Sequence, residues 1–287
     1  MSRTNELIAA FDAVPKKYLR EEMEEAVSLR EEITPLLIAI LDEIVVDPVR
    51  YIEEGHSAEI YAVALLAHYR ETKAHLSIIR AFSISDEQRE YIWCDMLTET
   101  LPALLCRTAG GDYSAVMEII RNRDAYEYLR TSALEALKLG IASGDLPRDR
   151  GMALFATLFD ETLAEPEDYF WASLVMDLLD LYPEELISEI RDLFVKGFVF
   201  QGEVSLKNVE DEMAEGRDKA MEKLRQLVVW SLPDDVHEYI SGIACFRGVD
   251  EKVPVSHGSP VNAQKKQKQK ERSNRKKAKV SKRKNRK

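Results

Sequence analysis

The 287-residue sequence contains few of the residues that interrupt helices or cross-link small secreted domains. It has 12 glycines, 10 prolines and three cysteines, Cys94, Cys106 and Cys245. Long stretches are instead rich in Leu, Ala, Glu and Arg, which favour helix. An odd number of cysteines without close pairing argues against a disulfide framework and predicts buried thiols in a reducing compartment.

Long apolar runs are also absent. Stretches such as residues 62–67 are far shorter than the ~20 apolar residues that a bilayer-spanning helix needs. The N-terminus has no apolar core behind a basic start, so a signal peptide is not expected. These absences predict a soluble, cytoplasmic protein with no membrane partner.

The charge is divided unevenly along the chain. The whole sequence has 40 basic and 51 acidic residues, but residues 264–287 hold 14 Lys or Arg and one acid, Glu271, a net charge of +13. Residues 1–263 therefore carry −24. An acidic body with a strongly basic tail is the clearest functional feature of the composition.

The composition of residues 264–287 predicts a disordered tail that binds polyanions. Dense positive charge gains affinity for phosphates through counterion release, and the tail has no aromatic residue for base stacking and no apolar anchor for a membrane. RNA or DNA would suit it; association with the acidic body, or a solubilising role, is the alternative. The basic residues are Lys265, Lys266, Lys268, Lys270, Arg272, Arg275, Lys276, Lys277, Lys279, Lys282, Arg283, Lys284, Arg286 and Lys287.

Residues 123–139 predict a strongly amphipathic helix around which the chain is organised. Leu129, Ala133 and Leu137 share one face, and Gly140 continues it, so a neighbouring helix can approach closely. We expect Arg130 to bond either Asp124, near the helix start, or the end of a neighbouring helix. The pattern is typical of the inner helix of a HEAT-type repeat.

Start signals divide the rest of the chain into helices of about 12–18 residues. Thr34 with Pro35 predicts one start, and the capping box from Ser85 to Gln88 predicts another. Residues 197–204 predict either an extended segment or a loop, followed by helices near 209–213 and 218–230 and a weaker one at 234–246. We therefore predict an all-α fold, a HEAT-like α-solenoid of stacked antiparallel helical pairs, over residues 1–246. A linker, 247–263, and the tail, 264–287, follow it.

No residue set predicts a catalytic or cofactor site. Asp95 and Glu99 lie one helical turn apart, as a carboxylate pair for metal binding or acid–base chemistry would, but ion pairs between helices explain them better. Glu53 and His56 show the Glu-x-x-His spacing once, at a glycine-marked helix end. His68 and His75 could share a face only if one helix continued between them.

Several blocks resemble a known bacterial family. Residues 95–105, residues 110–112 and residues 127–130 with Ala133 and Leu137 are similar to domain-of-unknown-function family 1186, and the likeness extends over residues 30–230. The resemblance implies no established activity. Members often end in a SEC-C zinc motif, but no cysteine follows Cys245 here, so the resemblance carries no zinc site over to this chain.

These observations favour a non-catalytic scaffold that binds a protein partner on the surface of a helical repeat. The alternative is a nucleic-acid- or ribosome-associated protein that uses its basic tail for contacts with phosphates regardless of sequence.

Overall fold

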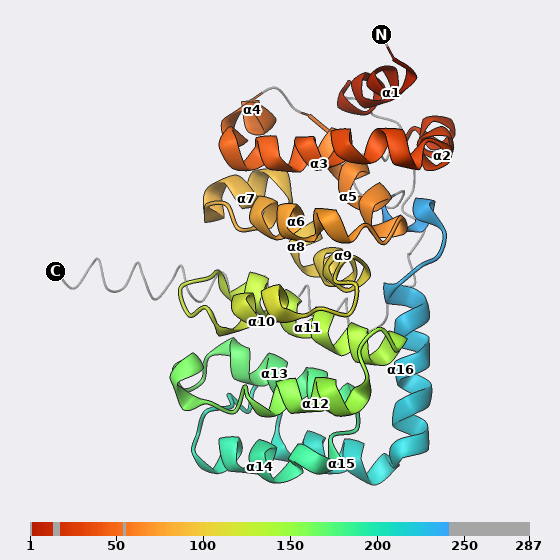
Figure 1. Cartoon of the computed structure of the whole chain (residues 1–287). Coiled ribbons are helices and arrows are strands. Elements are labelled where there is room, and N and C mark those ends of the chain that lie inside the picture. Colours follow the sequence, from red (N-terminus) through yellow and green to blue (C-terminus); the bar gives the residue numbers. More distant parts are fainter. Residues whose placement is uncertain (1, 14–17, 54–55, 241–287) are drawn as a thin grey trace, which may run out of the picture. The chain divides into compact units, whose positions relative to one another are not determined.

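We describe the chain from a computed structural model over residues 2–13, 18–53 and 56–240, all within the first of the two units into which the chain divides after Phe246. These residues form sixteen α-helices and four 3₁₀ helices, and they contain no strand, which confirms the all-α class (Figure 1). The bounds are α1 (Arg3–Asp12), α2 (Arg20–Ser28), α3 (Arg30–Val46), α4 (Pro48–Glu53), α5 (Ala58–His68), η1 (Thr72–Ala74), α6 (His75–Phe82), α7 (Asp86–Ile92), α8 (Met96–Glu99), α9 (Leu101–Thr108), α10 (Ser114–Arg121), α11 (Glu127–Ser143), α12 (Arg148–Ala156), η2 (Glu161–Leu163), α13 (Tyr169–Asp180), η3 (Glu184–Leu186), α14 (Ile187–Val195), α15 (Leu206–Glu215), α16 (Arg217–Ser231) and η4 (Val236–Tyr239).

The helices of this unit are arranged in two layers. In Figure 1, α3, α6, α10, α12 and α14 follow one another from the top of the view to the bottom. A second series of contacts joins α5 to α9, α9 to α11 and α11 to α13. The prediction that these layers form HEAT-like repeats of an α-solenoid stays a prediction.

Helix α11 lies at the centre of this arrangement, as the sequence predicts. It packs against α8, α9, α10, α12, α13 and α16. The predicted inner face is buried: Leu129 is 3% exposed, and Ala133 and Leu137 are fully enclosed. The helix ends at Gly144, whose left-handed backbone (φ 82°) suits glycine.

The segment after α16 returns to the N-terminal helices. Helix α16 packs across α11 and α13, and η4 then lies against α5. Nη2 of Arg107 donates to the backbone carbonyls of Leu232 (2.7 Å) and Pro233 (3.0 Å). The hydroxyl of Tyr18 and Nδ1 of His237 are 2.6 Å apart. Hydrogen bonds therefore join positions more than 120 residues apart in the chain.

Several sequence expectations need correction. Of the described α-helices only α3, α11, α13 and α16 have the expected 12–18 residues, and the others are shorter. Pro35 lies inside α3, which begins at Arg30; both Pro35 and Glu31 are exposed, so the carbonyl that loses its donor is on the solvent side. Cys94 is exposed in a left-handed turn (φ 43°), whereas Cys106 is buried as expected. Within residues 234–240 only η4 forms, and Cys245, the linker and the tail lie outside the described residues. No helix in the described ranges is long and apolar enough to cross a bilayer.

Candidate functional site

Two adjoining hollows flank α10 on the surface of the described residues. The larger, between α10 and α12, has a volume of about 610 Å³, and the smaller, between α6 and α10, about 330 Å³. Glu118 and Asn122 line both hollows, so we treat them as one site, the α10 groove. The larger hollow is lined by Asp112, Tyr113, Ser114, Met117, Glu118, Arg121, Asn122, Leu146, Arg150 and Leu154, and the smaller by Leu76, Ile79, Arg80, Ala115, Glu118, Ile119 and Asn122.

The pattern of α10 explains why its outer face is free to line a groove. Val116, Ile119 and Ile120 are buried, and α10 packs on α11. Ser114, Glu118 and Arg121 are exposed and follow at intervals of three or four residues, which is one face of a helix. The apolar side packs inward, and the polar side forms the ridge between the hollows.

Apolar side chains line much of the groove on either side of this ridge. Leu76 on α6 is 59% exposed, an unusual fraction for leucine, and Ile79 beside it is half-buried. Leu154 on α12 is also half-buried, and Met117 and Leu146 are almost fully enclosed. The groove therefore offers partly exposed apolar surface between polar groups, as ligand and peptide sites do.

The charged groups of the groove differ in how they are engaged. Arg80 pairs with Asp42 at 3.2 Å, and Arg121 donates to the hydroxyl of Thr157 at 2.6 Å, a neutral partner. Asp112 accepts from the backbone N–H of Ser114 at 3.0 Å, and this bond holds the pKa of its carboxyl below the usual value. Arg150 and Glu118 make no side-chain hydrogen bond or ion pair with the described residues, and both are exposed.

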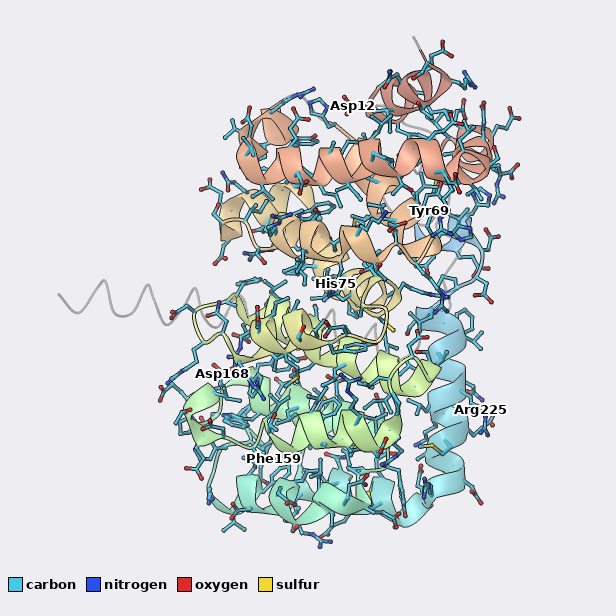
Figure 2. The ribbon with its side chains drawn as sticks, viewed as in Figure 1. Asp12, Tyr69, His75, Phe159, Asp168 and Arg225 are labelled. Carbon is cyan, nitrogen blue, oxygen red and sulfur yellow. The ribbon has the colours of Figure 1, made fainter. Side chains whose placement is uncertain are left out.

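The Arg130 side chain is placed to hold other elements together rather than to face a ligand. Its Nε donates to the carbonyl of Ile120, at the end of α10, and its Nη2 to that of Leu163, at the end of η2, both at 2.9 Å. The guanidinium also lies 4.3 Å from the ring centroid of Phe170. Burial lowers the pKa of Arg130, and the carboxylate of Asp168 (labelled in Figure 2) opposes that effect.

Asp124 does not supply the partner for Arg130. Helix α11 begins at Glu127, so Asp124 precedes it, in a turn where its backbone N–H donates to the side chain of Asn122 at 3.0 Å. Of the two partners expected for Arg130, Asp124 and the end of a neighbouring helix, the structure shows the second. Ala133 and Leu137 are buried on the same helix, α11.

Asp95 and Glu99 are both exposed at the two ends of the short helix α8, where the carbonyl of Asp95 accepts from the N–H of Glu99 at 3.0 Å. Over the described ranges no three His, Cys, Asp or Glu side chains come together as metal ligands would. The pair remains a sequence prediction.

The histidine candidates separate in the structure. His68 ends α5 and His75 begins α6, with η1 between them, so the two do not share a helix. His75 (labelled in Figure 2) is buried, and its Nδ1 lies 2.8 Å from the hydroxyl oxygen of Thr108. His56 Nδ1 lies 2.6 Å from a carboxylate oxygen of Asp12. The side chain of Glu53 lies outside the described residues.

Sequence reasoning missed several buried charged groups, of which Lys138 and Glu59 are the least exposed. Lys138 on α11 is 2% exposed, and its Nζ lies 2.8 Å from Asp177 and 2.9 Å from Asp180, both on α13. Burial alone would lower the pKa of Lys138, but these carboxylates raise it well above its ordinary value. Glu59 on α5 is 4% exposed. In each case the charged residue lies within an apolar stretch of the sequence, and this pattern could have indicated that its charge is buried.

The model of one protein family, described as "Protein of unknown function (DUF1186)", matches residues 2–247. The chain belongs to this family. An uncharacterized protein of Chlamydia trachomatis serovar D is 31% identical over 193 residues, which are 67% of this chain and 76% of the relative. One of Chlamydia muridarum is 32% identical over 193 residues, 67% of this chain and 77% of the relative. No solved structure matches the chain. The family match includes the α10 groove and excludes the basic tail, 264–287.

Proposed function

We propose that this protein is a non-catalytic scaffold with a HEAT-like helical surface, and that it binds a segment of a partner protein in the α10 groove. The observation that carries the proposal is the pair of adjoining hollows, about 610 and 330 Å³, on the two sides of one helix. Two hollows in line suit an elongated occupant, because a segment crossing α10 would contact both.

The chemistry of the occupant follows from the groups that the groove leaves unengaged. Leu76, Ile79 and Leu154 are the partly exposed apolar contacts, so the segment carries apolar side chains toward both hollows. Arg150 and Glu118 are exposed charges that form no side-chain hydrogen bond or ion pair with the described residues, although the charge of Arg150 also acts on the carboxyl of Asp112. A segment with an acidic side chain near α12 and a basic one above α10 would complement both charges.

Selection of peptides from a random-sequence display library on the full-length protein tests this proposal. Enriched peptides are then measured against Arg150→Glu, Glu118→Arg and Leu76→Asp. We expect each substitution to weaken binding about tenfold or more, since each removes or reverses one complementary contact worth ~1.4 kcal/mol. Arg191→Glu is the matched control, because Arg191 is an exposed arginine on α14 with no side-chain partner among the described residues.

Charge exchange strengthens the same experiment. A peptide whose acidic residue is replaced by lysine should regain affinity for Arg150→Glu and lose it for the wild-type protein. Peptides that bind the wild type, Arg150→Glu, Glu118→Arg and Leu76→Asp equally would place the binding surface elsewhere and refute the groove.

Polyanion binding by the tail is a second candidate function, supported by the charge of +13 over residues 264–287. RNA binding by the full-length protein is compared with that of a variant whose tail lysines and arginines are glutamines, at several salt concentrations. If about half of the 14 cationic side chains contact phosphates of a single strand, log K should fall with log salt at a slope of about −5. Equal binding by both proteins would exclude the tail as the binding element.

A further inference from the structure

A cluster of polar and titratable side chains lies where α1 meets the start of α5. Asp12 ends α1 and is labelled in Figure 2, and His56 and Ser57 precede α5. His56 Nδ1 lies 2.6 Å from Asp12, and the hydroxyl of Ser57 donates to the backbone carbonyl of Phe11 at 2.5 Å. The rings of Phe11 and Tyr61 stack at 4.3 Å between centroids. These contacts attach the C-terminal end of α1 to the first turn of α5.

Glu59 lies in this first turn, where burial outweighs the groups that favour a negative charge on its carboxyl. Its side chain is 4% exposed, and its buried Oε2 accepts no hydrogen bond from the described residues. Burial, and to a lesser degree the charge of Asp12, raise the pKa of the Glu59 carboxyl to about 7, although its own backbone N–H and His56 act in the opposite direction. Glu59 is thus a carboxyl group that gains or loses its proton near neutral pH.

The groups around Glu59 offset only part of the cost of ionising its carboxyl. Asp12 of α1 is itself acidic, and the histidine beside it, His56, is already bonded to Asp12. Burial raises the pKa of Tyr51 on α4, and the charge of Glu59 adds to this effect. The hydroxyl of Tyr51 nevertheless donates to Glu43 of α3. Arg50, on the same helix as Tyr51, forms an ion pair with Glu43. An ionised Glu59 would therefore lie buried next to a second carboxylate.

We propose that Glu59 is a proton-controlled latch that holds α1 on α5 when it is protonated and releases α1 when it is ionised. Release would uncover the inner face of α1, where Leu7 is 1% exposed and Phe11 fully enclosed. The latch would thus couple proton concentration to the exposure of an apolar helix face. It is independent of the α10 groove, which involves α6, α10 and α12.

The direction of the effect follows from proton linkage. In the docked state the carboxyl titrates near pH 7, and in the released state it titrates near its ordinary value of 4.5. Between these values release frees one proton, so the equilibrium constant for release rises as pH rises, by at most about tenfold per pH unit. Above pH 7 both states are ionised, and the constant levels off.

Amide hydrogen exchange of the full-length protein between pH 5 and pH 8 measures this equilibrium. Exchange in residues 3–12 is divided by the intrinsic rate at each pH, and helix α13 serves as the internal reference. We expect the protection of α1 to fall between pH 5 and pH 7 and then to become constant, while that of α13 does not change. Glu59→Gln, which resembles the protonated acid, should keep α1 protected at every pH.

Glu59→Met provides a second variant without a titratable group, in case the glutamine amide is poorly accommodated. Glu21→Gln is the matched control, since Glu21 is an exposed acid on α2, and it should retain the wild-type profile. An α1 profile that is flat in the wild type, or equally steep in Glu59→Gln, would overturn the latch.

Discussion

The hydroxyl oxygen of Tyr113 occupies the place where a side chain of residue 140 would begin. A Cβ atom added to Gly140 would lie 2.0 Å from that oxygen and 2.4 Å from Cζ of the same ring. Both residues are buried, with Tyr113 2% exposed. The glycine in α11 thus lets the aromatic side chain that precedes α10 lie directly against the helix.

Gly140→Ala should consequently destabilise the protein although alanine is the better helix former. The ring of Tyr113 is enclosed and cannot move away freely, so we expect a loss of about 1–3 kcal/mol in the free energy of unfolding. Urea unfolding followed by circular dichroism measures it. In a protein that already carries Tyr113→Ala, Gly140→Ala should cost almost no stability. A similar cost of Gly140→Ala in the wild type and in Tyr113→Ala would contradict the steric account.

The ion cluster of Lys138 gives a second stability prediction. Lys138→Met removes the ammonium group from Asp177, which is 6% exposed, so we expect a cost of about 3–5 kcal/mol. Adding Asp177→Leu should recover much of this loss, because the buried carboxylate is then gone as well. Asp180→Asn is the comparison, since Asp180 is half exposed and its charge is partly solvated; a larger loss from Asp180→Asn than from Lys138→Met would refute the assignment.

Arg130 should be intolerant even of lysine. Lysine carries the charge but cannot reach both the Ile120 and Leu163 carbonyls with a planar fork, nor lie flat over Phe170. We expect Arg130→Lys to cost about 1–3 kcal/mol by chemical denaturation. Arg123→Lys is the matched control: Arg123 is exposed and pairs with an exposed Glu165, so its replacement should change stability by less than ~0.5 kcal/mol.

These examples show what the sequence could and could not predict. The period of apolar residues in 123–139 was sufficient to predict that α11 is central and that Leu129, Ala133 and Leu137 face inward, because burial of one face depends only on local spacing. The partner that fills the space above Gly140 was not predictable, because Tyr113 approaches it from outside α11. For Arg130 the sequence predicted the end of a neighbouring helix as one of two partners, but it could not predict which carbonyls accept, because these lie 10 and 33 residues away in the chain.

The candidate groove depended on tertiary structure even more. Its lining comes from α6, α10, α12 and the turns before α10 and α12, and no motif marks these segments as one surface.

The helix caps show how far the sequence predicts local structure. Ser85 precedes α7 as expected, but its hydroxyl bonds the side chain of Gln88, and the one reciprocal capping box among the described helices joins Ser205 and Asn208 before α15. Glutamine was the expected partner in such a box, so asparagine was overlooked.

His75 supplies a prediction for the acid side of the stability profile. The hydroxyl of Thr108 donates to the carbonyl of Leu104 at 2.8 Å, so its oxygen accepts from Nδ1–H of His75, and Nε2 is left unprotonated and buried without a partner. Protonation would place an N–H⁺ group there with no acceptor. Burial accordingly lowers the pKa of His75 below its ordinary value of 6.5.

The sign of the effect follows from this shift. Below pH 6.5 the unfolded chain binds a proton at position 75 that the folded protein does not, so the folded state loses stability as pH falls toward the lower pKa of the buried ring. One such proton contributes at most about 1.4 kcal/mol per pH unit. Urea unfolding of wild type and His75→Gln between pH 4.5 and 7.5 should show a shallower acid decline in the variant. His237→Gln is the comparison, because Nε2 of His237 lies 3.4 Å from a carboxylate oxygen of Glu24, whereas Nε2 of His75 has no hydrogen-bond partner among the described residues. An equal reduction in both variants would exclude His75 as the source.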